Sequence, residues 1–113
     1  MTTFLSWNLN GFRTRLEDFK LLLSRFSPSV VCLQETYLLP QDPLKARGYK
    51  TYRTDIDDGS RAHGGVAVLV DDNIFSKEVS VRSRLQVVCV RVRIRNTEHA
   101  IVICIFRLDK ILP

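Results

Sequence analysis

Hydrophobic and polar positions divide the first third of the chain into a strand, a helix and a second strand. The short, mostly apolar run from Thr3 to Asn8 predicts a strand, and Asn10-Gly11 ends it. From Arg13 to Phe26, apolar residues recur at helical spacing with charged residues between them, which predicts an amphipathic helix. The residues Ser27-Pro28-Ser29 end this helix, and the apolar run from Val30 to Leu33 predicts a strand covered on both faces.

The two strands of this strand-helix-strand unit are expected to be neighbours in one sheet, and parallel. The segment Gln34-Glu35-Thr36 then follows the carboxyl end of a central strand. Because open α/β sheets commonly bind ligands at that end, the unit predicts a ligand site close to Glu35.

The rest of the chain predicts strands and turns without another long helix. The stretch from Asp55 to Gly65 is rich in Asp and Gly and predicts a loop, and Asp71-Asp72-Asn73 predicts a turn. The predicted strands cover residues 48–53, 66–70, 75–81, 85–95 and 100–106. One helix with about six or seven strands predicts an α+β or α/β sandwich and argues against a helical bundle.

Composition and charge say less about function than the hydrophobic pattern says about the fold. The chain of 113 residues is 45% hydrophobic and 26% charged, which is ordinary for a soluble domain and unlike a disordered chain. A net charge of +5 favours a polyanionic partner, although many basic proteins bind no nucleic acid. Neither a signal-peptide pattern nor a membrane-length apolar run is present, so we expect a nuclear or cytoplasmic protein that is not secreted and has no membrane partner.

The three cysteines, Cys32, Cys89 and Cys104, all lie inside apolar runs, and no two of them have metal-ligand spacing. We therefore expect small buried side chains in a reducing compartment, in preference to a disulfide or a zinc site.

Glu35 is the leading candidate for chemistry. A carboxylate directly after a buried strand is costly to desolvate unless a cation or hydrogen-bond donors meet it. Magnesium suits such a position, because it uses one or two protein carboxylates together with water and substrate phosphate oxygens. The alternative is that Glu35 lies just outside the core and is solvated.

Other polar residues near this position have two interpretations each. The amides of Asn8 and Asn10 could fix a metal ligand or a phosphate oxygen, or the two residues could simply flank the turn at Gly11. His63, with Arg61 nearby, could contact phosphate or be an exposed loop residue.

A basic stripe lies on the alternating segment near the C-terminal end of the sequence. Arg91, Arg93 and Arg95 are predicted to face away from the apolar side of their strand. The stripe could be a nucleic-acid footprint, or an ordinary solvated face or sheet edge.

Two sequence blocks at this separation resemble the opening of the endonuclease/exonuclease/phosphatase superfamily. They are Trp7-Asn8-Leu9-Asn10-Gly11 and Leu33-Gln34-Glu35-Thr36. Downstream, the chain is similar to the endonuclease of non-LTR (jockey-like) retrotransposons at Gly48-Tyr49, at Tyr52-Arg53 and from His63 to Val70. The resemblance covers Thr3 to about Phe106 and favours this branch over apurinic/apyrimidinic repair nucleases.

The resemblance implies a DNase-like α/β sandwich of the α+β class. The chain would supply the N-terminal half, a mixed sheet with one main helix over residues 1–107, followed by an unmatched tail at 108–113. On this view the chain is roughly one layer of two, so the inner face of its sheet would lack a partner and would favour self-association.

The resemblance also implies a site and a reaction. Glu35 is similar to the glutamate that binds Mg2+ or Mn2+, and Asn8 to the strand-end asparagine that orders metal and phosphate, both being catalytic. Asn10, Arg61 and His63 would lie near DNA, although an aspartate often stands in place of Asn10 in the repair branch. The reaction would be hydrolysis of a DNA phosphodiester, nicking target DNA to prime a fused reverse transcriptase.

Parts of the family pattern do not occur in the sequence. It holds neither a Gly-Asp-x-Asn block nor a Ser-Asp-His block, and Phe106 stands about where a tyrosine is expected. We therefore expect a truncated N-terminal fragment of a magnesium-dependent DNA endonuclease, inactive or nearly so on its own. The alternatives are a noncatalytic nucleic-acid-binding remnant, or a repair-nuclease or phosphatase branch of the same superfamily.

Overall fold

The computed structural model describes residues 2–55, 64–81 and 86–105. Arg61, His63 and the segment from Phe106 onward lie outside these residues, so the predictions made for them stay predictions. The described elements, in chain order, are β1 (Phe4–Asn8), α1 (Leu16–Phe26), β2 (Val30–Gln34), β3 (Tyr49–Thr54), β4 (Val66–Asp71), β5 (Phe75–Val79), β6 (Gln86–Ile94) and β7 (Thr97–Ile105).

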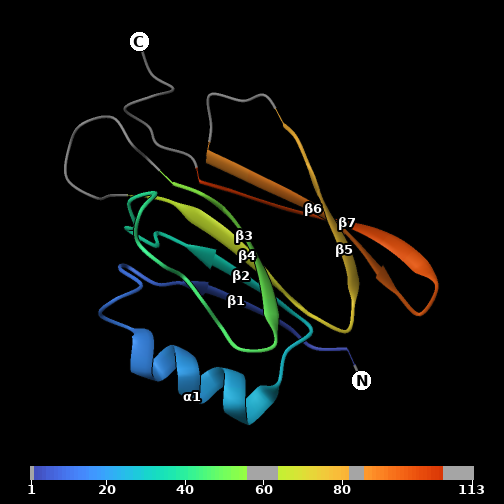
Figure 1. The fold of residues 1–113 in the computed structure, drawn as a ribbon, viewed down its shortest axis with the longest axis horizontal. Coiled ribbons are helices and arrows are strands. Elements are labelled where there is room, and N and C mark those ends of the chain that lie inside the picture. The colour runs from blue at the N-terminus through green and yellow to red at the C-terminus, as the bar shows by residue number, and fades with distance from the viewer. Residues whose placement is uncertain (1, 56–63, 82–85, 106–113) are drawn as a thin grey trace.

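A four-stranded sheet carries the two sequence blocks that suggest chemistry. Its strand order is β1-β2-β4-β3 (Figure 1). The strands β1 and β2 are parallel neighbours, as predicted, whereas β4 runs antiparallel to both β2 and β3. Because β2 is an internal strand, Glu35 does follow a central strand of the sheet.

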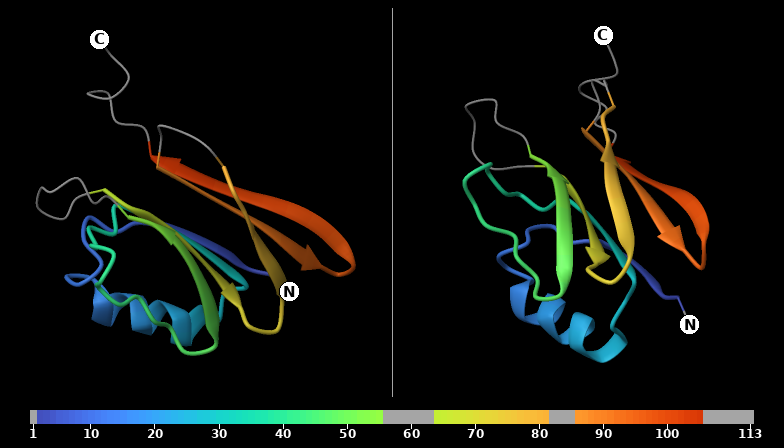
Figure 2. Two further views of the ribbon diagram at one scale, coloured as in Figure 1. Left: turned by 45° about the horizontal axis from the view of Figure 1, so that its top comes forward. Right: turned by 45° about the vertical axis from the view of Figure 1, so that its right-hand side comes forward.

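The helix α1 covers one face of this sheet (Figures 1 and 2). Its buried residue Phe19 packs edge-on against Phe12, with ring centroids 5.4 Å apart. The helix begins at Leu16, later than the predicted Arg13, because residues 12–15 form a turn in which the N–H of Arg15 donates to the carbonyl of Phe12 at 3.1 Å. No helix among the described residues is long and apolar enough to span a membrane.

The other face of the four-stranded sheet is covered by a three-stranded sheet of order β5-β6-β7 (Figure 2). The predicted alternation on β6 is confirmed: Val88, Val90 and Val92 are buried, and Arg91 and Arg93 are exposed. These valines share one apolar cluster with the first sheet, where its members are Val30, Val66, Val68 and Val70. The two packed sheets with a helix outside confirm the predicted α+β sandwich.

The expectation that the inner face of the first sheet would lack a partner is wrong. The turn at residues 71–73 directs β5 away from that sheet, and β5 begins a second layer. Two hydrogen bonds support the packing of the layers: Tyr52 Oη and Ser76 Oγ are 2.7 Å apart, and Thr54 Oγ1 donates to the carbonyl of Val87 at 2.9 Å. Self-association therefore requires a different surface.

The hairpin between β6 and β7 turns more tightly than predicted. Arg95 and Asn96 have φ values of 52° and 63°, as in the two-residue type I′ turns that match the twist of paired strands. As a result β7 begins at Thr97, earlier than the predicted Ala100. Arg95 belongs to the turn, so the basic stripe on β6 itself consists of Arg91 and Arg93.

The burial predicted for the cysteines is confirmed in full for Cys89 and in part for Cys32. Cys32 is partly buried, Cys89 is buried, and both are free thiols. Burial raises the pKa of the Cys32 thiol, so this group stays protonated and weakly nucleophilic at neutral pH.

Candidate active site at the carboxyl ends of β1 and β2

Three chain segments are joined by main-chain hydrogen bonds where β1 and β2 end. Bonds of 2.9 Å connect the N–H groups of residues 9, 11 and 12 to the carbonyls of residues 34, 35 and 36, respectively. The N–H groups of Thr36 and Tyr37 donate in turn to Gly65 at 3.3 Å and to Gly64 at 2.8 Å, just before β4. Because each segment is tied to the next, this edge of the sheet is preorganised by the fold.

The structure brings Asn8 beside the segment that carries Glu35. Asn8 lies opposite Gln34, the residue directly before Glu35. Leu5 and Trp7 pack into the cluster under α1, so Asn8, which alternates with them, belongs to the face turned toward the second sheet. The predicted pair Asn8 and Glu35 therefore comes from adjacent strand ends.

The Glu35 carboxylate is unpaired among the described residues. Its side chain is only partly buried, and no hydrogen bond or ion pair links it to another residue in the described part of the chain. Its φ of 53° lies in the left-handed region, as do those of Asn10 (51°) and Tyr37 (55°). Non-glycine residues held in such conformations cluster at functional sites.

Tyr37 orients the amide of Asn10. Its hydroxyl donates to Asn10 Oδ1 at 2.7 Å, which leaves Asn10 Nδ2 as a donor for an anion such as a phosphate oxygen. Gln34 Nε2 donates to Ser6 Oγ at the longer distance of 3.5 Å. Sequence spacing gave no signal for Tyr37, because its role depends on how two strand-end loops meet.

Two arginines near these loops form ion pairs with carboxylates. Arg13 Nη2 lies 2.5 Å from Asp42 Oδ1, and Arg53 Nη2 lies 3.0 Å from Asp55 Oδ2. Arg53 also donates to the carbonyls of Leu39 at 2.9 Å and Asp42 at 2.7 Å. With side chains only 19% and 10% exposed, Arg53 and Asp55 hold the loop after Tyr37 in place. Amide groups are therefore better placed than these guanidinium groups to meet a phosphate.

Metal binding at this edge would rest on one carboxylate. The described ranges contain no group of three or more His, Cys, Asp or Glu residues that could hold a metal ion. A single carboxylate with amide oxygens nearby fits Mg2+ or Mn2+, which can retain several water ligands. The same set does not fit a structural zinc site, which needs four nitrogen or sulfur ligands.

Gly65 allows these segments to approach each other closely. Its φ is +93°, and a Cβ atom at this position would lie 2.3 Å from Thr36 Oγ1. Thr36 is 1% exposed, and its Oγ1 has no hydrogen-bond partner among the residues that the structure describes. A side chain at position 65 would therefore push directly against a buried threonine of the Glu35 loop.

We predict that Gly65→Ala destabilises the chain more than Gly48→Ala does. Gly48 has a similar φ of +86° but open space around its Cβ position, so it controls for backbone strain, which costs about 1–2 kcal/mol. The contact with Thr36 should add about 1–3 kcal/mol to the cost at position 65. Denaturant unfolding measures the loss in free energy of unfolding for each variant. The extra loss at position 65 should vanish when Thr36 is also replaced by Ala. Equal costs at the two glycines would contradict the close contact.

Comparison with known proteins gives the family and the fold. A sequence model of the Endonuclease/Exonuclease/phosphatase family matches residues 5–105. A curated relative, the probable RNA-directed DNA polymerase from transposon X-element of Drosophila melanogaster, is 29% identical over 70 residues, which is 62% of this chain and 8% of the relative.

Three solved structures share the sandwich. An AP endonuclease from Archaeoglobus fulgidus has a TM-score of 0.62 and 23% identity, over 88% of this chain and 40% of that one. A humanized D. rerio TDP2 has a TM-score of 0.59 and 16% identity, over 89% and 48%. The 3′ phosphatase NExo from Neisseria, bound to product DNA hairpin, has a TM-score of 0.51 and 20% identity, over 85% and 39%.

The structural comparisons and the family model support different conclusions. The solved structures are each under 25% identical to this chain, so they establish the fold. This chain also spans less than half the length of each of them. The family follows from the sequence model, which matches nearly the whole chain. The chain belongs to the Endonuclease/Exonuclease/phosphatase family.

Proposed function

We propose that this chain supplies the metal- and phosphate-ordering part of a magnesium-dependent DNA endonuclease, of the kind that nicks target DNA for retrotransposition. The observation that carries the proposal is the β1–β2 register, which sets Asn8 opposite Gln34 and hence next to Glu35. Nucleases of this family generally use divalent metal ions, and the fly relative is a transposon polymerase. The DNA hairpin on NExo further supports a DNA substrate.

Each residue of the site has a distinct part in the proposal. Glu35 would hold the ion, which polarises a phosphoryl oxygen and stabilises the leaving oxygen when bound. Asn8 would orient the ion and the scissile phosphate from the adjacent strand end. Asn10, fixed by Tyr37, would donate its amide to a phosphate oxygen, and Arg61 and His63 would contact DNA nearby. Hydrolysis by water would free a 3′ hydroxyl for a fused reverse transcriptase.

We further propose that the 113-residue chain is an N-terminal fragment with little or no activity of its own. A base-type aspartate from a Gly-Asp-x-Asn block and a phosphate-contacting histidine from a Ser-Asp-His block are both missing from the sequence. Loss of such groups costs several powers of ten in rate. The partial domain would cover residues 1–107, with 108–113 as a tail, in a nuclear or cytoplasmic protein.

Metal binding can be tested with Mn2+ as a paramagnetic probe. We predict that Mn2+ broadens the backbone amide signals of residues 8–11 and 34–37 first, because these lie around the Glu35 carboxylate. Glu35→Gln keeps the shape of the side chain but removes its charge, so it should raise the Mn2+ concentration needed by about tenfold or more.

The matched control is Glu78→Gln, which removes the same charge from an exposed residue of β5. The amide signals of this variant should broaden at the same Mn2+ concentration as those of the wild type. If the amide signals of Glu35→Gln also broaden at the wild-type Mn2+ concentration, Glu35 is not the metal ligand.

Activity can be tested with supercoiled plasmid in Mg2+. We predict no conversion to open circles above the buffer background, because the general base and the phosphate-contacting histidine are absent from the sequence. The proposed inactivity would be overturned by nicking that Glu35→Ala abolishes. Nicking that Glu35→Ala leaves unchanged would indicate a contaminating nuclease.

A second candidate function is noncatalytic nucleic-acid binding through the outer face of the three-stranded sheet. Lys77 lies directly opposite Arg91 in the β5–β6 ladder, and within the described residues neither forms an ion pair. Like charges at opposite positions destabilise a sheet unless an anion lies over them. Arg93, by contrast, is paired with Glu98 at 3.1 Å and lies over the Phe75 ring.

This candidate predicts DNA binding that weakens steeply as salt rises. The double variant Lys77→Gln/Arg91→Gln should lower the slope of log affinity against log salt by about 2, because each phosphate contact contributes about 0.9. A control double variant, Arg47→Gln/Lys50→Gln, removes the same charge from exposed positions at and near the start of β3. Weak binding that does not change with salt would argue against this function.

A further inference from the structure

Arg53 is a largely buried arginine in which every nitrogen of the guanidinium group donates a hydrogen bond. It lies near the end of β3, and its side chain is 19% exposed. Its Nε donates to both carboxylate oxygens of Asp55, at 3.1 and 3.0 Å. Its Nη1 donates to the Asp42 carbonyl at 2.7 Å, and its Nη2 to the Leu39 carbonyl at 2.9 Å. This forked set of contacts requires a planar guanidinium group, which a lysine ammonium group cannot replace.

The contacts of Arg53 tie the loop that follows β2 to the end of β3. Asp42 strengthens the same loop, because its Oδ2 accepts the Leu39 N–H at 2.9 Å and its Oδ1 accepts from Arg13 Nη2 at 2.5 Å. Arg13 belongs to the segment between β1 and α1, which also holds Asn10. Side chains therefore join three segments at this edge of the sheet, in addition to the main-chain hydrogen bonds between them.

The loop anchored by Arg53 begins with residues of the candidate site. Glu35 and Tyr37 precede Leu39 in this loop, and both have left-handed backbone, with φ values of 53° and 55°. Non-glycine residues keep such conformations only when the surrounding structure over-determines them. Main-chain hydrogen bonds fix the loop as far as Tyr37, and Arg53 fixes the part that follows. The strained residues are thus held from both sides.

We propose that Arg53 is a positioning residue of the candidate site, which acts through the loop after β2 and contacts neither metal nor phosphate. By holding two carbonyls of this loop, it keeps Glu35 and Tyr37 in their left-handed conformations. The Glu35 carboxylate then stays at the strand end, and the Tyr37 hydroxyl stays on Asn10 Oδ1. This inference rests on the proposed metal site and adds to it a residue that holds the site from outside.

The alternative role for Arg53 is a direct contact with a phosphate group. A phosphate contact depends on positive charge, which lysine retains. The contacts with two carbonyls and a carboxylate depend on the fork, which lysine lacks. All three guanidinium nitrogens already donate within the described residues, and Asp55 offsets the charge. The structure therefore favours the positioning role, and Arg53→Lys separates the two.

A Mn2+ titration of the 113-residue chain, followed through the amide signals of residues 8–11 and 34–37, tests the proposal. Arg53→Lys should raise the Mn2+ concentration needed for broadening by about tenfold, as is usual when a residue that orients a metal ligand is replaced. Asp55→Asn removes the charge that aligns the guanidinium group, so it should raise this concentration by a smaller factor. Arg47→Lys makes the same change at an exposed arginine before β3 and should match the wild type.

Two further measurements separate positioning from a loss of stability. Val92→Ala removes packing from the buried core of β6, away from Val87, where β6 meets the end of β3. While the chain stays folded, this variant should bind Mn2+ as the wild type does. In the metal-free chain, Arg53→Lys should accelerate hydrogen exchange of the Tyr37 amide, which donates to Gly64, more than Val92→Ala does.

The variant Glu35→Gln distinguishes a failure of this inference from a failure of the metal site. If Glu35→Gln raises the required Mn2+ concentration and Arg53→Lys does not, the role of Arg53 is wrong and the site stands. If Glu35→Gln has no effect, the site and the role of Arg53 are both wrong. Equal effects of Arg53→Lys and Val92→Ala would also overturn the role, because both would then report stability alone.

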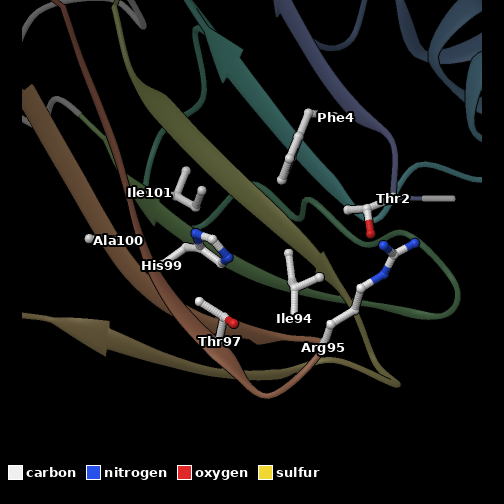
Figure 3. A pocket seen from close by; sticks show the side chains of 8 residues that line it. All are labelled: Thr2, Phe4, Ile94, Arg95, Thr97, His99, Ala100 and Ile101. Atoms are coloured by element: carbon white, nitrogen blue, oxygen red, sulfur yellow. The ribbon is translucent and has the colours of Figure 1, made fainter.

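The cleft of about 630 Å³ between β1 and the β6–β7 hairpin takes no part in this inference (Figure 3). Its lining residues, among them Phe4, His99 and Ile101, belong to other parts of the fold. None of them contacts Arg53 or the loop that it holds.

Discussion

The parallel pairing of β1 with β2 is the contact on which the rest of the structure depends. Its register sets Asn8 opposite Gln34, and the same ladder continues past the strand ends until Thr36. A slip of one residue would exchange the two faces of β1. Leu5 and Trp7 would then leave the cluster under α1, and Asn8 would turn away from the second sheet. The packing of Leu5 and Trp7 under α1 therefore fixes the face of the sheet on which Asn8 lies.

This arrangement of loops carries a conformational cost that the core must offset. Left-handed backbone at Asn10, Glu35 and Tyr37 costs on the order of 1–3 kcal/mol at each residue. Main-chain hydrogen bonds between the loops recover part of it. The rest is offset by apolar clusters on both faces of the first sheet, which meet in β4, where every residue from Val66 to Val70 is buried. The strand ends that carry Asn8 and Glu35 are thus supported by one fully buried strand.

Local pattern predicted the helix, the strands and the parallel pair, because burial periodicity and a single crossover determine them. It also predicted that Asn8 and Glu35 lie at the ends of adjacent strands, since both positions follow from where the strands end. It did not predict that β5 opens a second layer, because the weak alternation of that strand does not say which sheet it joins. Nor did it predict the contact of Tyr37 with Asn10 or the close approach of Gly65 to the Glu35 loop. Both depend on left-handed loops, which apolar spacing does not encode.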